Sequence, residues 1–199
     1  MFELLDIIRE LRLKYGPLIK LAENSSFFLN LIEKRPILGS ILEKLRPQPL
    51  MPEEFVRELQ RLIVNAEAEA RIIIYSPYLY EKAVERYLAL MDTATKRGVK
   101  IIIYTLTSNH PSIKRKNKHK ILIEKLRKVN AEVRIRKNMH EKAVIMLDKE
   151  NRAAYFGSLN PLSKYKGKAD YMLKFTHPKI VNTLYLFLET LAEESEREQ

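Results

Sequence analysis

The stretch that decides the fold spans residues 139–160 and reads MHEKAVIMLDKENRAAYFGSLN. Its apolar run from Ala143 to Leu147 is typical of a buried strand. His140 and Lys142 stand two residues apart at the entry to this run. Because a strand alternates its side chains between two faces, the imidazole and the ammonium group should point the same way, with Glu141 opposite.

A second polar group comes at the end of the stretch, in Gly157-Ser158-Leu159-Asn160. Glycine lets the returning chain approach its neighbours closely. Ser158 and Asn160 are again two residues apart, so their hydroxyl and amide groups should be aimed at one point. A titratable ring, a fixed cation and two hydrogen-bonding groups together suit an anion, and a phosphodiester fits them best.

The pattern HxK, then an Asp, then GSxN resembles the HKD signature of the phospholipase D superfamily. MHEK with GSLNPLS is similar to compact nuclease-type domains of that superfamily, including those attached to bacterial and archaeal helicases. The resemblance covers about residues 70 to 190, with one departure. Where the family places its Asp this chain has Leu147, and Asp148 follows one position later. A shift of one residue moves a side chain to the other face of a regular strand, although in the family this acid is largely structural.

The resemblance implies a mechanism that needs two histidines. In-line displacement at phosphorus requires a nucleophile on one side and an acid for the leaving oxygen on the other. The chain holds one copy of the signature, and family members with one copy pair two chains. We therefore expect a homodimer in which two His140 side chains face each other, one forming a phosphohistidine and the other protonating the leaving oxygen.

The same resemblance assigns the remaining catalytic roles. Lys142 and Asn160 would hold the non-bridging oxygens of the phosphate, and Ser158 would assist them. An acid shortly after GSxN holds the second imidazole nitrogen in the family, and Asp170 matches its position. This scheme requires no cofactor, and the sequence has none of the usual metal-ligand spacings.

Charge indicates the class of substrate. The 36 Lys and Arg residues outnumber 25 Asp and Glu residues, which gives a net charge of +11 and favours a polyanionic partner. One basic run, IKRKNKHK at residues 113–120, should form a loop after an inner strand, and further lysines follow the GSLN turn. A solvated flexible loop is the alternative interpretation. The residues that we expect to bind nucleic acid are Lys114, Arg115, Lys116, Lys118, Lys164, Lys166 and Lys168.

Periodicity divides the chain into two parts. Residues 1–50 show helical stripes and should form a small helical appendage, either a cap or a partner-docking module, which ends in a linker at residues 47–49. Residues 51–199 should form the catalytic domain. There the predicted strands are 71–75, 100–105, 132–136 and 169–176, beside the 139–160 segment, and helices are predicted at 121–129 and 180–192. The expected fold is α/β, a mixed central sheet flanked by helices, with a parallel crossover between the first two strands.

Three functional classes fit this sequence. The first is a metal-independent endonuclease acting on DNA or RNA; the others are a lipid phosphodiesterase and a DNA-binding domain without catalysis. No apolar run is long enough to cross a bilayer, so we expect no membrane partner and a cytoplasmic protein. A helicase domain or subunit is a further possible partner. We assign His110, His119 and His177 to loop or capping roles.

Overall fold

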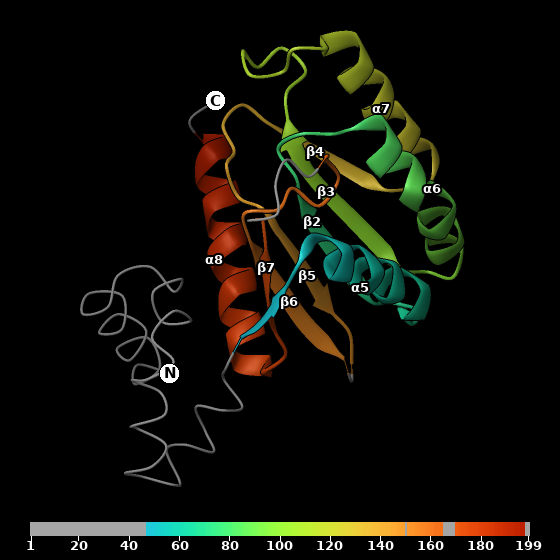
Figure 1. Ribbon diagram of the computed structural model, residues 1–199, viewed down its shortest axis with the longest axis vertical. Coiled ribbons are helices and arrows are strands. Elements are labelled where there is room, and N and C mark those ends of the chain that lie inside the picture. The colour runs from blue at the N-terminus through green and yellow to red at the C-terminus, as the bar shows by residue number, and fades with distance from the viewer. Residues whose placement is uncertain (1–46, 150, 165–169, 198–199) are drawn as a thin grey trace, which may run out of the picture. The chain divides into compact units, whose positions relative to one another are not determined.

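A computed structural model describes residues 47–149, 151–164 and 170–197 (Figure 1). The chain divides into two compact units, Met1–Pro47 and Gln48–Gln199, and every element described below belongs to the second. The helical appendage predicted for residues 1–50 lies, up to residue 46, outside the described residues.

The second unit is built on one mixed sheet of seven strands in the order β1-β7-β6-β5-β2-β3-β4. Its strands β2, β3 and β4 run parallel, and all the other pairings are antiparallel. The strands are β1 (Gln48–Leu50), β2 (Arg71–Tyr75), β3 (Lys100–Leu106), β4 (Glu132–Arg136), β5 (Ala143–Leu147), β6 (Arg152–Gly157) and β7 (Met172–Phe175). The α/β fold with a mixed central sheet is thus confirmed.

Helices cover both faces of the sheet, with α8 on one side and α5, α6 and α7 on the other (Figure 1). The helices are α5 (Pro52–Asn65), α6 (Glu81–Lys96), α7 (Lys116–Lys128) and α8 (Pro178–Arg197). Strand β2 shows why its apolar run is continuous. Ile72 and Ile74 pack with the three-helix side, while Ile73 and Tyr75 pack with the α8 side, so every residue of the run is buried.

Two local predictions were wrong. The predicted linker contains strand β1, because Gln48–Leu50 pairs with β7 at the edge of the sheet. Pro49 is tolerated there because an edge strand leaves one side of its backbone unpaired. The predicted loop at residues 113–120 is also shorter than expected, since α7 begins at Lys116. The first turn of α7 is mostly charged and shows no apolar stripe, so the sequence pattern did not predict a helix there.

Gly157 permits a close approach between β6 and β7. A Cβ atom at this position would lie 2.3 Å from the carbonyl oxygen of Tyr171 and 3.0 Å from Cα of Met172. Since both contacts are with main-chain atoms, a larger residue would have to push β7 away.

We therefore expect Gly157→Ala to lower the free energy of unfolding by about 2 kcal/mol, the usual range for overpacking at a rigid site. Urea unfolding followed by circular dichroism measures this change. An unfolding midpoint equal to that of the wild type would show that β7 can move away from β6 without cost.

Candidate active site

The predicted catalytic residues lie at one edge of the sheet, the edge that is formed by the ends of its central strands and not by an outer strand. In the register of the strands, Tyr75 at the end of β2 pairs with Ala143 at the start of β5, and Ala143 pairs with Phe156 of β6. Gly157, which ends β6, pairs with Met172, which begins β7. The strand ends that carry the signature are therefore neighbours. The predicted residues at these ends are His140 and Lys142 before β5, Ser158 and Asn160 after β6, and Asp170 before β7.

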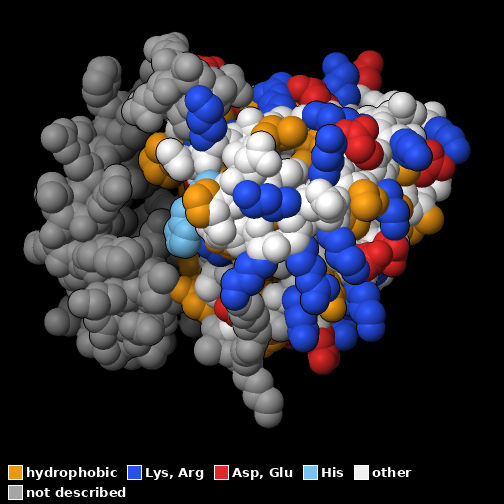
Figure 2. All heavy atoms as spheres, turned by 90° about the horizontal axis from the view of Figure 1, so that it is seen from above, with side chains coloured by type: hydrophobic (Ala, Val, Ile, Leu, Met, Phe, Trp, Pro, Cys, Tyr) orange, Lys and Arg blue, Asp and Glu red, His pale blue; other side chains and the backbone are white. Residues whose placement is uncertain are grey.

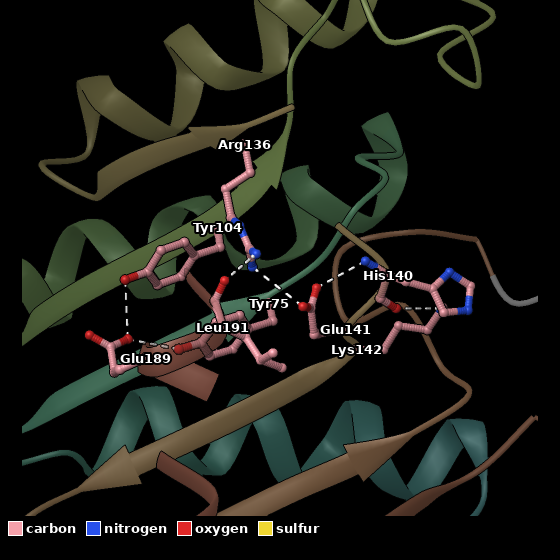
Figure 3. Close-up of polar contacts among 8 residues, drawn as sticks. All are labelled: Tyr75, Tyr104, Arg136, His140, Glu141, Lys142, Glu189 and Leu191. Carbon is pink, nitrogen blue, oxygen red and sulfur yellow. Dashed lines mark hydrogen bonds and ion pairs between the residues drawn. The ribbon is translucent and has the colours of Figure 1, made fainter. Parts of the chain in front are cut away.

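His140 and Lys142 form the centre of this edge. The Lys142 ammonium donates a hydrogen bond to the main-chain oxygen of His140 at 2.8 Å (Figure 3). The main-chain oxygen of Lys142 accepts from the Gly157 N–H at 3.2 Å, which joins this segment to the end of β6. His140 itself is exposed. Its imidazole is thus held on a fixed main chain and remains open to a ligand.

Burial acts on the charge of Lys142. It lowers the pKa of the ammonium group, while the carboxylates of Glu141 and Asp170 act in the opposite direction. The positive charge is therefore kept in a partly desolvated place, where an incoming anion would restore part of the lost solvation.

Ser158 and Asp170 are brought together by the approach of β7. The Ser158 hydroxyl donates to Oδ1 of Asp170 at 3.3 Å and accepts the Tyr171 N–H at 3.1 Å. Asp170 also acts electrostatically on Lys142, so the acid, the hydroxyl and the cation share one neighbourhood. The predicted role of Asp170 in holding the second nitrogen of His140 stays a prediction.

Asn160 is placed where a ligand could use it. Within the described part of the chain, its side-chain oxygen is buried and has no hydrogen-bond partner. Its main-chain oxygen accepts the Ser163 N–H at 3.2 Å, which closes the turn after β6. A buried amide oxygen without a partner costs free energy, so this side chain is suited to a group that is present only in a complex.

Arg136 and Glu141 adjoin the site, although our sequence reasoning gave them no role. One Glu141 oxygen accepts the His140 main-chain N–H at 2.9 Å, and the other lies 3.5 Å from the Arg136 guanidinium (Figure 3). Glu141 points away from the side on which Lys142 lies, as the alternation between strand faces predicts. The pair could not be found from spacing alone, because Arg136 ends a different strand, β4.

Asp148 lies away from the site. It follows the last residue of β5, whereas Lys142 precedes the first, so the strand separates the two. The Asp148 side chain is buried and accepts the Lys149 N–H at 2.6 Å. Its displacement from the family position therefore leaves the edge that carries His140 unchanged.

Basic residues occupy the same edge. The segment after β3 exposes Lys114, Arg115, Lys116 and Lys118, and Lys164 is exposed after the GSLN turn. Figure 2 views the molecule from above this edge and shows Lys and Arg side chains spread across it. Lys166 and Lys168 lie outside the described residues. Lys137, which directly follows β4, is a further exposed cation that the sequence reasoning missed.

A cleft of about 160 Å³ opens beside these residues. Its walls are the segment after β2, with Tyr78 and Tyr80, and the segment from Ser112 to Lys118. The Tyr80 N–H donates to the main-chain oxygen of Leu162 at 2.8 Å, so the first wall is bonded to the turn that carries Asn160. The five predicted catalytic residues do not themselves line the cleft.

The other histidines differ in their surroundings. His119 was predicted to have a loop or capping role, which is wrong: it lies within α7, is buried, and contacts the hydroxyls of Thr105 and Ser108. Burial lowers the pKa of His119, so the ring is kept neutral. His177 directly precedes α8, and its main-chain oxygen accepts the Val181 N–H, the first bond of the helix. Its Nδ1 atom is buried and has no hydrogen-bond partner among the described residues, so a capping role for the side chain stays a prediction.

Comparison with known families identifies the chain. Residues 59–186 match the family described as "Cardiolipin synthase, PLD-like domain", which covers more than half of the sequence. The chain therefore belongs to this family and to the phospholipase D superfamily. A comparison with curated proteins found no match.

Solved structures with a similar fold include NucT from Helicobacter pylori, with a TM-score of 0.53 and 19% identity over 75% of this chain and 96% of NucT. Polyphosphate kinase from Porphyromonas gingivalis has a TM-score of 0.52 and 15% identity over 82% of this chain but 28% of the kinase. Nuc, a phospholipase D family member from Salmonella typhimurium, has a TM-score of 0.48 and 19% identity, covering 74% of this chain and 93% of Nuc. At such identities the similarity describes the fold, and function has to be argued from the site.

Two kinds of feature are absent from the described residues. Over residues 47–149, 151–164 and 170–197, no three or more His, Cys, Asp or Glu side chains are grouped so that they could hold a metal ion. In the same part of the chain, no helix combines the length and the apolar character needed to cross a membrane.

The lowered pKa of Lys142 predicts how stability changes with pH. Between the folded-state pKa and the ordinary value of 10.5, the unfolded chain binds more protons than the folded one, so the free energy of unfolding rises with pH. Lys142→Met keeps an unbranched side chain of similar length and removes the titrating group. We expect the wild type to gain stability relative to this variant as the pH is raised from neutral towards 10.5.

Urea unfolding at a series of pH values measures the difference. Lys100→Met is the control, because Lys100 is exposed at the opposite end of the sheet. If the two variants differ from the wild type by amounts that do not change with pH, then Lys142 carries no burial cost.

Proposed function

We propose that this protein is a metal-independent phosphodiesterase that cleaves nucleic acid through a phosphohistidine intermediate at a homodimer interface. Membership of the phospholipase D superfamily supports the general class, a hydrolase acting on phosphodiester bonds. The observation that carries the proposal is the gathering of His140, Lys142, Ser158 and Asp170 at one open edge of the sheet.

Each side chain has a defined task in this proposal. The neutral imidazole of His140 attacks phosphorus, and the bond to the leaving oxygen breaks as that oxygen takes a proton from the partner's His140. The partner's imidazole then removes a proton from water, which attacks the phosphohistidine and releases the phosphate and the first imidazole. Lys142 neutralises charge on the non-bridging oxygens and the Asn160 amide N–H donates a hydrogen bond to them, an effect worth about 3 to 4 kcal/mol for one such donor.

The geometry of His140 supports the dimer. The signature occurs once in the chain, and one imidazole cannot stand on both sides of phosphorus. His140 is exposed, so a second copy of the chain could approach it without any rearrangement of the core. A twofold axis beside His140 would bring both imidazoles to one phosphate.

Charge supports nucleic acid as the substrate. The net charge of +11 and the exposed cations at the same edge suit a chain of phosphates more than a single lipid headgroup. The description of the family names cardiolipin synthase, so a lipid phosphodiesterase is the second candidate. A DNA-binding domain without catalysis is the third.

The first experiment incubates the purified protein with labelled DNA, RNA and cardiolipin vesicles in excess EDTA, beside His140→Ala. We expect nucleic acid to be cut in the chelator and the variant to be inactive. Cleavage of lipid alone would move the assignment to the second candidate, and binding without cleavage to the third. Activity that EDTA abolishes would overturn the metal-independent mechanism.

The cations that line the cleft should bind phosphates of the substrate. We expect a triple variant, Lys114→Gln with Arg115→Gln and Lys118→Gln, to weaken binding to duplex DNA and to flatten its salt dependence. Each lost phosphate contact should lower the slope of log K against log salt by about 0.9. Binding is measured by fluorescence anisotropy in the His140→Ala background, so that no substrate is consumed.

A matched triple variant tests whether position or total charge matters. Lys96→Gln, Lys100→Gln and Lys149→Gln remove three exposed cations that lie at the end of α6, at the start of β3 and after β5, at the other end of the sheet. The slope for this control should stay close to that of the parent. Equal losses of DNA affinity and of salt dependence in the two triple variants would show that the cations of the cleft have no special role.

A further inference from the structure

Glu141 lies between the two signature residues and has no task in the mechanism above. We propose that Glu141 and Arg136 form a clamp that positions His140 for attack and ties it to helix α8. Both are positioning residues, because they act through the main chain of His140. The inference rests on the proposed function for its catalytic part, while the clamp itself can be tested without any activity.

The carboxylate of Glu141 holds two groups at once. One oxygen accepts the His140 N–H at 2.9 Å, and the other lies 3.5 Å from the Arg136 guanidinium (Figure 3). The main-chain oxygen of His140 is held in turn by the Lys142 ammonium at 2.8 Å. Both polar groups of the His140 main chain are therefore bonded, while the imidazole stays exposed. This arrangement fixes the Cα to Cβ direction from which the nucleophile projects.

Arg136 is the inner end of the clamp. Its side chain is 3% exposed, and it donates to the main-chain oxygen of Leu191 in α8 at 2.8 Å. Its own main-chain oxygen accepts the Thr107 N–H at 2.8 Å, which fixes the end of β4 against the segment after β3. A buried guanidinium needs a charged partner, and Glu141 supplies one. Arg136 thus links the His140 segment to both the sheet and α8.

Helix α8 is itself held against the sheet at this level. Glu189, two residues before Leu191, accepts hydrogen bonds from the hydroxyls of Tyr75 at 2.8 Å and Tyr104 at 3.1 Å (Figure 3). Burial, together with the charge of Glu189, raises the pKa of Tyr104 to about 12, so its hydroxyl remains a donor at neutral pH. Two hydrogen bonds from the sheet therefore hold Glu189 of α8, and Arg136 is bonded to the same helix two residues later.

The chemistry explains why such a clamp would matter. A reacting group displaced by about 1 Å loses on the order of 100-fold in rate, even when the substrate still binds. An exposed histidine on a segment outside the regular strands would otherwise sample many orientations. Holding the main chain of His140 leaves the approach of the phosphate open and restricts the direction of attack.

The test compares Glu141→Ala, Glu141→Gln and Glu132→Ala. Glutamine can still accept the His140 N–H but loses the charge that faces Arg136, whereas alanine loses both contacts. Glu132 is the matched control, because it begins the strand that Arg136 ends and pairs instead with Arg134 at 2.6 Å. We expect kcat to fall about 100-fold in Glu141→Ala and less in Glu141→Gln, with KM within about twofold of the wild type, and Glu132→Ala to keep its kcat.

Hydrogen exchange separates the clamp from the proposed function. The His140 amide should be protected from exchange in the wild type and in Glu132→Ala, and it should exchange at least about tenfold faster in Glu141→Ala. Unchanged exchange in Glu141→Ala, or a kcat equal to that of the wild type, would overturn the clamp. A wild type that cleaves no phosphodiester but shows the predicted exchange pattern would overturn the proposed function and its catalytic use of the clamp, while the clamp itself would stand.

Discussion

The antiparallel pairing of β5 with β2 is the constraint on which the rest of the structure depends. It joins the parallel part of the sheet to the antiparallel part and sets Tyr75 opposite Ala143. In this register Val144 faces the three-helix side of the core and Ile145 faces the α8 side. A slip of one residue would exchange the two sets, so burial on both faces fixes the register and, with it, the place of His140.

The sequence predicted those parts of the fold and site that depend on local pattern. The apolar runs gave β2, β3 and β5, and the spacing in HxK and GSxN singled out residues that the strand ends then bring together. Contacts that depend on how separate elements pack could not be read in this way. Arg136 and Glu141 are close in the sequence, but Arg136 is also bonded to Leu191 of α8, 55 positions further along the chain. No short-range signal encodes that arrangement. Local signals also failed where two preferences competed, as in the charged first turn of α7 and the proline of β1.

The site combines features that oppose stability with features that restore it. Lys142 is partly desolvated, and the Asn160 side-chain oxygen is buried without a partner in the described part of the chain. Both are unfavourable in the free protein. A bound anion would offset the cost at Lys142, whereas the Asn160 oxygen accepts hydrogen bonds and would need a donor. The main chain around these two side chains is held in place, since main-chain hydrogen bonds join Lys142 to Gly157 and Ser158 to Tyr171. Unsatisfied groups can persist there because their neighbours leave them no alternative position.

The edge therefore has a closed inner side and an open outer side. On the inner side, Met139 packs into the core that lies under α8, and the residue after it, His140, is bonded through its main chain to Glu141. On the outer side, His140 is exposed, and so are the cations that follow β3. In the proposed mechanism, a second chain and a polyanion must both reach His140 from outside. Rigidity in this protein must then come from behind the histidine, which is where Arg136 and α8 lie.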